Sequence, residues 1–266
     1  VFIQSNSLKS EITPNANVFI GLCSFEGENI NGGNQKHLVI YEKGAFQSIV
    51  FNDCNCIQGN QNTVTISSTV APNNANLKFE CVNMDKCATD DSEQPPATDE
   101  CQSYPKREEA YGKEITLQKS CFNQLRSTSR EGGAVRVINS KLNLNECKFA
   151  NCSCLKSGGA VYVYFSIDNC RLTANKCVFE NCTSEEEGGA FYFTNEFASE
   201  SSIENCKFYN NNAVSHGGAL YYAPCSHSKL ARNLFVNNSC TATSKIHGSA
   251  VYALIQDVNV KQSQGR

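Results

Sequence analysis

The feature that most constrains the fold is a Gly-Gly-Ala tripeptide that recurs along the chain and is followed each time by alternating apolar residues. Its copies are separated by 26, 30, 29 and 31 residues, and a second motif, Phe-x-Asn followed by Cys or Asn, recurs in phase with it. Self-similarity at a fixed period is typical of repeat architectures. The first motif begins at Gly132, Gly158, Gly188, Gly217 and, as Gly-Ser-Ala, at Gly248; the second begins at Phe149, Phe179, Phe208 and Phe235.

The length and pattern of one repeat indicate which repeat architecture this is. Each repeat holds two or three short runs with period-2 alternation, rich in Val, Phe, Tyr and Ile and broken by Gly, Asn and Ser. No repeat has a helical apolar stripe or the L-x-x-L-x-L pattern of leucine-rich repeats, and a propeller blade needs about 40–50 residues. We therefore predict an all-β chain folded as a right-handed parallel β-helix, with Gly-Gly at a corner that needs positive φ or close backbone approach.

The aromatic motif continues less regularly toward the N-terminus, at Phe25, Phe51, Phe79 and Phe122. The interval from Phe79 to Phe122 is 43 residues, whereas the others are 26 to 30. The long interval contains a Pro-rich, charged segment, which is typical of a surface insertion. We predict about eight coils in chain order: irregular coils over 1–84, a loop insertion over 85–113, regular coils over 114–255 and a polar tail over 256–266.

Equivalent side chains of stacked coils lie about 4.8 Å apart, so the repeated residues should form ladders. We expect the four phenylalanines of the second motif to form one inward stack and its asparagines to form a hydrogen-bonded turn ladder. Three of the asparagines begin Asn-x-Ser/Thr sequons; a glycan cannot fit if their column points inward, so we expect structural roles for them. The ladder asparagines are Asn151, Asn181, Asn210 and Asn237, and the sequons begin at Asn151, Asn181 and Asn237.

The chain has 16 cysteines, and their spacing does not indicate zinc, because its two C-x-C pairs have no histidine pair near them. We interpret the cysteines as disulfides of an oxidising compartment. A disulfide needs Cα atoms about 4.4–6.8 Å apart, a distance that neighbouring coils supply. The alternative is that they are buried thiols that pack as small apolar residues. The leading pairs are Cys152–Cys182 and Cys87–Cys101, while Cys147, Cys177 and Cys206 form a column of three in which one must pair elsewhere or stay free.

Composition excludes several partners. Charged residues make up 18% and the net charge is −3, without the clustered basic excess of a nucleic-acid or anionic-membrane binder. No run approaches the ~18–20 apolar residues of a membrane span. No cofactor or metal is expected. The chain begins at Val1 without an initiator Met or a signal peptide, so we expect either a processed form or a piece of a longer chain.

Gly-Gly-Ala with an apolar residue and then Tyr, alternating with Phe-x-Asn-Asn, resembles the polymorphic membrane protein repeat, whose signature pairs G-G-A-[ILV] with F-x-x-N. The copies that end at Asn211 and Asn238 match the second half, whereas Cys152 and Cys182 stand at that position in the earlier copies, a departure that suggests local disulfide replacement. The resemblance covers 132–254. Members of that family are surface-exposed or secreted β-helical passenger domains of chlamydiae, with similar repeats in protist surface proteins. The resemblance implies adhesion or surface architecture and no catalytic residues.

We therefore expect a non-catalytic extracellular or cell-surface protein. It would act in adhesion, with a host-cell or matrix ligand, or as a fibre component that self-associates through its coil ends or continues into further coils. The alternative is a polysaccharide lyase or hydrolase, which needs carboxylates of adjacent coils to converge on one face. The candidate carboxylates are those of 185–187, Asp168 and Glu204, and none has a repeated counterpart. We predict that the chain is not an enzyme.

Overall fold

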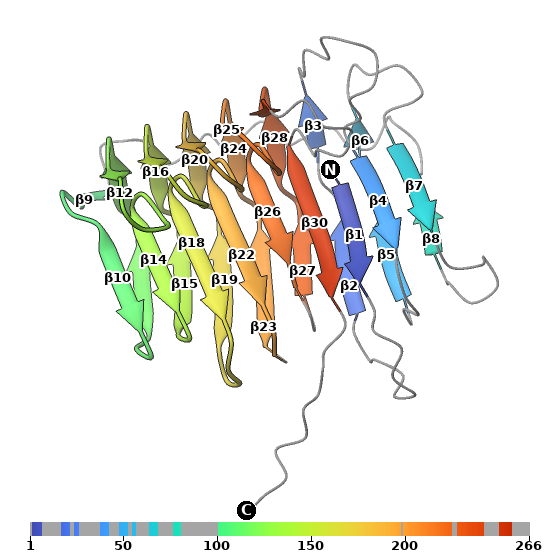
Figure 1. Ribbon diagram of the computed structural model, residues 1–266, viewed down its shortest axis with the longest axis horizontal. Coiled ribbons are helices and arrows are strands. Elements are labelled where there is room, and N and C mark those ends of the chain that lie inside the picture. The colour runs from blue at the N-terminus through green and yellow to red at the C-terminus, as the bar shows by residue number, and fades with distance from the viewer. Residues whose placement is uncertain are drawn as a thin grey trace, which may run out of the picture.

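The computed structural model describes residues 101–197, 199–224, 228–241 and 250–256, together with eight short strands before residue 101. All of its strand pairs are parallel and belong to four sheets, here named A to D, and the described residues contain no helix. The chain is a β-solenoid, as predicted (Figure 1).

Sheet A contains, in spatial order, β10 (Glu108–Tyr111), β14 (Val135–Ile138), β18 (Val161–Phe165), β22 (Phe191–Asn195), β26 (Leu220–Ala223), β30 (Val251–Gln256), β1 (Phe2–Asn6), β4 (Leu38–Glu42) and β7 (Val64–Ser68). Sheet B contains β11 (Ile115–Gln118), β15 (Lys141–Asn145), β19 (Arg171–Asn175), β23 (Glu200–Glu204), β27 (Ser228–Ala231), β2 (Asn17–Gly21), β5 (Ser48–Asn52) and β8 (Leu77–Glu80). Sheet C contains β9 (Gln102–Ser103), β12 (Ser120–Asn123), β16 (Lys148–Ala150), β20 (Val178–Glu180), β24 (Lys207–Tyr209), β28 (Leu234–Val236), β3 (Ser24–Glu26) and β6 (Asn55–Cys56). Sheet D contains β13 (Arg126–Ser127), β17 (Ser153–Cys154), β21 (Thr183–Ser184), β25 (Asn212–Ala213) and β29 (Ser239–Cys240).

Each full coil runs through sheets C, D, A and B, and the solenoid has about five turns rather than the eight predicted. The stacking of the coils in chain order was wrong as well. Strands β1, β2 and β3 instead pair with β30, β27 and β28, so the N-terminal strands extend the stack beyond the C-terminal coil (Figure 1, blue beside red). The edge of a sheet offers unpaired N–H and C=O groups, and a strand from any part of the chain can pair there.

The predicted insertion at 85–113 also needs correction at its C-terminal end. Within it, β9 pairs with β12 and β10 pairs with β14, so 101–111 belongs to the first coil of the regular stack. Residues 81–100, including Cys87, lie outside the described residues.

The core lies inside the coils because strand residues alternate between buried and partly exposed positions, as in β18, with Val161, Val163 and Phe165 buried. The predicted phenylalanine stack is present: successive rings of Phe149, Phe179, Phe208 and Phe235 lie 4.8–4.9 Å apart and nearly parallel. Phe122 and Tyr104 extend it at the end that the first coil forms. The stack fixes the register of the coils.

The corners of each coil are made by residues with left-handed backbone conformation. The first glycine of each exact Gly-Gly-Ala has φ between 63° and 73°, a conformation that glycine adopts without steric cost. The second glycine serves close approach: a Cβ on Gly159 would meet the carbonyl oxygens of Gly189 and Thr183 in the next coil. The two functions proposed for Gly-Gly are thus divided between its two residues.

Two further corners lie between sheets B and C and between sheets C and D, and polar residues form both of them. Glycine tolerates positive φ best, and among the other residues asparagine tolerates it better than most. At the first corner φ is 46–55°, and at the second it is 52–58°. The first column is Lys119, Glu146, Lys176, Asn205 and Arg232; the second is Gln124, Asn151, Asn181, Asn210 and Asn237.

Candidate functional site

The residue that follows each polar corner points into the solenoid in most coils and forms a turn column of cysteine and asparagine. In the later coils the amide of asparagine bridges two coils: Asn211 accepts a hydrogen bond from the Cys182 N–H at 2.9 Å and donates one to the Phe179 carbonyl at 3.1 Å. Asn233 and Asn238 make the same pair of bonds. Cysteine occupies the equivalent position in earlier coils. The columns are Cys147, Cys177, Cys206 and Asn233, and Cys152, Cys182, Asn211 and Asn238.

The thiols in these columns replace the asparagine amides at the same backbone groups. Cys147 Sγ lies 3.3 Å from the Leu117 carbonyl and Cys182 Sγ lies 3.7 Å from the Phe149 carbonyl, distances at which a thiol donates a weak hydrogen bond. Cys152 and Cys182 are both free in the structure, which corrects the predicted Cys152–Cys182 bridge. Cys147, Cys177 and Cys206 are free as well, and all five are fully buried.

Burial raises the pKa of the Cys177 thiol and that of the Cys182 thiol well above the ordinary value. A buried, protonated thiol is a poor nucleophile and a poor metal ligand. Cys177 and Cys182 therefore serve packing and turn formation, which is the alternative that the sequence left open.

A disulfide does join Cys101 to Cys121, with Cα atoms 5.6 Å apart, so the predicted Cys87–Cys101 pairing is wrong at Cys101. The bridge links the residue before β9 to β12, two strands that pair in register. Closing a loop of 20 residues restricts the unfolded chain.

Replacing Cys121 with Ser is expected to lower the free energy of unfolding by about 2–4 kcal/mol, because the loop-closure entropy of the unfolded chain is regained. Denaturant unfolding of the variant and of wild type, with and without reductant, measures this. Reductant should destabilise wild type and leave the variant unchanged. Equal sensitivity of the two proteins to reductant would contradict the Cys101–Cys121 assignment.

The sequence left open whether the column of corner asparagines points inward, and the structure shows these side chains outside. Asn151, Asn181, Asn210 and Asn237 are all exposed, and Asn151 Nδ2 donates to Asn123 Oδ1 at 3.0 Å across two coils. The inward hydrogen-bonded ladder is formed by the following residue of each corner. The left-handed φ of the corner residue turns the chain from sheet C to sheet D, and the residue after it then points inward.

A column of tyrosines lies on the outer face of sheet A. Tyr162, Tyr192, Tyr221 and Tyr252 occupy equivalent positions, with successive ring centroids 4.6–5.1 Å apart and ring planes within 15°. We call these four residues the tyrosine column. Tyr162 and Tyr192 are half-buried, whereas Tyr221 and Tyr252 are 8% and 7% exposed. The accessible part is thus nearest the first coils.

Arg136 stands at the position equivalent to Tyr162 in the preceding coil and covers that end of the tyrosine column. Its guanidinium carbon lies 5.1 Å from the Tyr111 ring centroid and 6.0 Å from that of Tyr162, within the range of cation–π contact. Its Nε donates to Glu131 Oε2 at 3.0 Å. Tyr111 itself is 50% exposed. The surface here combines aromatic edges, a cation and hydroxyl groups.

The hydroxyls of the tyrosine column remain protonated at physiological pH. Burial raises the pKa of Tyr162 and that of Tyr252 to about 12, and the carboxylates of Glu131 and Glu187 favour the neutral form further. Burial also raises the pKa values of Tyr192 and Tyr221 above the ordinary value. A neutral phenol both donates and accepts hydrogen bonds, so the accessible part of the column, Tyr162 and Tyr192, presents such groups.

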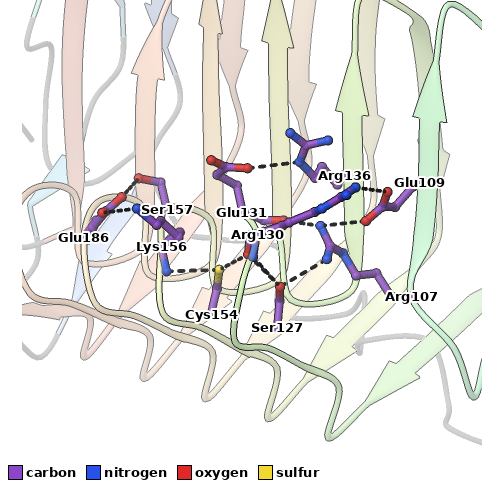
Figure 2. A network of polar contacts seen from close by, with 10 residues as sticks. All are labelled: Arg107, Glu109, Ser127, Arg130, Glu131, Arg136, Cys154, Lys156, Ser157 and Glu186. Atoms are coloured by element: carbon purple, nitrogen blue, oxygen red, sulfur yellow. Dashed lines mark hydrogen bonds and ion pairs between the residues drawn. The ribbon is translucent and has the colours of Figure 1, made fainter.

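A polar network lies beside Arg136 and ties the turns before three Gly-Gly corners together (Figure 2). Arg107 donates to Ser127 Oγ at 3.1 Å and pairs with Glu109 at 3.1 Å, and Glu109 also pairs with Arg130 at 3.3 Å. One coil further, Cys154 Sγ donates to the Arg130 carbonyl at 3.0 Å. Lys156 and Ser157 then contact Glu186 at 3.5 and 3.1 Å. The network holds the turns in fixed positions next to the tyrosine column.

The carboxylates weighed for catalysis are placed apart. Glu204 pairs with Lys229 and Arg232, and although burial opposes ionisation, these cations and Ser202 lower its pKa. Glu186 belongs to the polar network, and Glu187 lies 3.5 Å from His216. Asp168 is exposed on a turn. Each paired carboxylate already stabilises a contact between coils.

Within the described residues, no group of three or more His, Cys, Asp or Glu side chains is arranged to hold a metal ion. In the same part of the chain no helix has the length and apolar character that a membrane crossing requires.

Comparison of the chain with family models, with curated proteins and with solved structures finds no match. The site is therefore interpreted from its own geometry.

Sequence reasoning missed the tyrosine column although its signal is present. Tyrosine stands two residues after the alanine of four copies of the first motif, and Arg136 stands there in the first copy. In a strand with buried residues on either side of it, this position must face outward. The position of the tyrosine within the repeat, rather than its residue type alone, identifies the column.

Proposed function

We propose that the chain is a non-catalytic, secreted or cell-surface right-handed β-helix protein of the adhesion type. It binds an extended ligand of a host cell or extracellular matrix along the tyrosine column. The observation that carries the proposal is the tyrosine column itself, with Arg136 and Tyr111 at its accessible end. Right-handed coiling follows from the preference of parallel strand connections.

Three properties of this surface support binding. Tyrosine and arginine are enriched in binding surfaces, where they supply large contact area together with hydrogen bonds. The rings are fixed by stacking and by the strands beneath them, so little side-chain entropy is lost when a ligand binds. Equivalent groups repeat at strand spacing along the axis, which suits a ligand that is itself extended and repetitive.

We propose in addition that the chain associates through its coil ends, and the open sheets support this. Strands β10, β11 and β13 stand at the ends of sheets A, B and D among the described strands. Their outer N–H and C=O groups can pair with another coil, and a head-to-tail contact of this kind extends into a fibre. That coil would come from a second copy or from the same polypeptide.

The test of binding compares wild type with the double variant Tyr162→Ser/Tyr192→Ser on two probes, an epithelial cell monolayer and a plate coated with basement-membrane extract. Loss of both accessible rings is expected to weaken binding at least about tenfold, since aromatic anchors carry most of an interface's energy. The matched control, Asn143→Ala/Thr173→Ala, changes outward residues of sheet B and should bind as wild type does. Failure of wild type to bind either probe, or equal binding by the tyrosine variant, would contradict the proposal.

A further inference from the structure

The corner between sheets C and D presents a row of exposed asparagines, three of which begin Asn-x-Ser/Thr sequons. We propose that this corner is an N-glycosylated edge of the solenoid, with glycans attached at Asn237 and at one of the two neighbouring sites, Asn151 or Asn181. The inference depends on the secretory route of the proposed function. It assigns a modification site at a different corner from the tyrosine column.

The geometry meets the two requirements of an N-glycan, an accessible amide nitrogen and room outside the fold. All three asparagines are exposed, and each has a left-handed φ of 53–54° at the sharpest point of the corner. The backbone N–H groups of Asn151 and Asn181 already pair with carbonyls of the next coil, at 2.9 and 3.0 Å. The side chain is therefore not needed to close the turn.

The neighbouring residue explains why the glycan does not compete with folding. The residue after the sequon asparagine makes the inward hydrogen bonds of this corner. Asn238, which follows Asn237, is an example: its Nδ2 donates to the Phe208 carbonyl. Asn151 Nδ2 donates to Asn123 Oδ1, and a glycosylated amide keeps one N–H with which to continue this bond. Structure and modification thus use different residues of the same corner.

The chemistry requires a lipid-pyrophosphate-linked oligosaccharide and an oligosaccharyltransferase. The Nδ2 atom attacks C1 of the first sugar, forming the N–C1 bond while the bond from C1 to the phosphate oxygen breaks. The lipid pyrophosphate leaves, and the amide gives up one proton to a base of the transferase. No oxidation or reduction takes place.

The ladder geometry limits the number of glycans. Asn151 and Asn181 lie on adjacent coils, as the bond from the Asn151 N–H to the Glu180 carbonyl shows, and adjacent strands are about 4.8 Å apart. A branched oligosaccharide is wider than this spacing, so one of the two sites excludes the other. Asn210, which has no sequon, separates Asn181 from Asn237. Two glycans per molecule are therefore expected from three sequons.

The experiment directs the full chain into the secretory pathway of a cultured eukaryotic cell and maps the secreted protein by mass spectrometry before and after enzymatic deglycosylation. The expected result is two glycans per molecule, with Asn237 occupied and Asn151 and Asn181 occupied in alternation. Thr183→Ala removes the sequon while keeping Asn181 at the corner, and it should raise occupancy at Asn151. Secreted protein that carries no glycan would overturn the proposal, and molecules that carry three would overturn the exclusion.

Two matched variants test whether the outward corner decides occupancy. Asn212→Thr places a sequon on outward Asn210, and Ala213→Ser places one on inward Asn211; the neighbouring coil already has Thr183 and Ser184 at these positions. Only the first variant should gain a glycan in secreted, folded protein. Equal occupancy of Asn211 and Asn210 would overturn the assignment. These measurements are independent of adhesion: a glycosylated chain that binds neither cells nor matrix contradicts the proposed function alone.

Discussion

Phe179→Ala is expected to lower the free energy of unfolding by about 3–5 kcal/mol, the range for deleting a large aromatic side chain from a close-packed core. The Phe179 ring is fully buried between Phe149 and Phe208, with ring centroids 4.9 and 4.8 Å away, and its edge meets Phe191 at 5.6 Å. Each neighbour is held on its own coil by parallel pairing, so none can move into the space left behind. The cavity therefore remains open, and the free energy of unfolding falls by the full amount expected for such a cavity.

Denaturant unfolding, monitored by circular dichroism, measures the effect. The control is Tyr104→Ala at the end of the same stack, where the ring has one stacking neighbour, Phe122 at 4.9 Å, and is partly exposed. It should lose clearly less stability than Phe179→Ala. If the two substitutions cost the same, the stack is not a continuous core element and the register of the coils is wrong.

The phenylalanine stack could be predicted from the sequence because parallel stacking converts a sequence period directly into spatial equivalence. Residues one period apart occupy the same place on successive coils, so the phase of Phe149 and Phe179 alone placed their rings together. The same logic identified the Gly-Gly corners. It fails where the period fails, which is why the order of the N-terminal strands could not be predicted.

The direction of the corner side chains could not be predicted, because periodicity says which residues are equivalent but not which of two adjacent polar residues faces inward. That depends on the sign of φ at Asn151 and its equivalents. The sequence did contain a hint: in two copies the second residue is Cys152 or Cys182, and cysteine is among the most often buried residues. The partner of Cys101 was missed for a related reason, since β9 was placed in a loop and its pairing with β12 could not be foreseen.

Gly189→Ala is expected to cost at least about 4 kcal/mol, which is exceptional for the addition of one methyl group. A Cβ at Gly189 would overlap the Gly218 carbonyl oxygen and lie 2.5 Å from the carbonyl carbon and oxygen of Asn212. All of these are backbone atoms of the next coil, so no rotamer change can relieve the contact. The strain must separate the coils or break the hydrogen bond from the Gly189 N–H to the Gly217 carbonyl, which is 3.1 Å long.

The substitution with which to compare it is Gly112→Ala, because Gly112 has φ of 63° and open space around its Cβ position. That variant reports the cost of left-handed backbone alone, about 1–2 kcal/mol. Gly189 has no left-handed conformation in the structure, so its larger cost measures close approach between coils and nothing else.

The yield of folded protein and the unfolding midpoint of both variants decide the matter. Folded Gly189→Ala with a midpoint equal to or above that of Gly112→Ala would mean that the coils are not in contact at this corner. Because equivalent glycines at 133, 159 and 189 face the next coil in the same way, that result would contradict the packing of the whole regular solenoid.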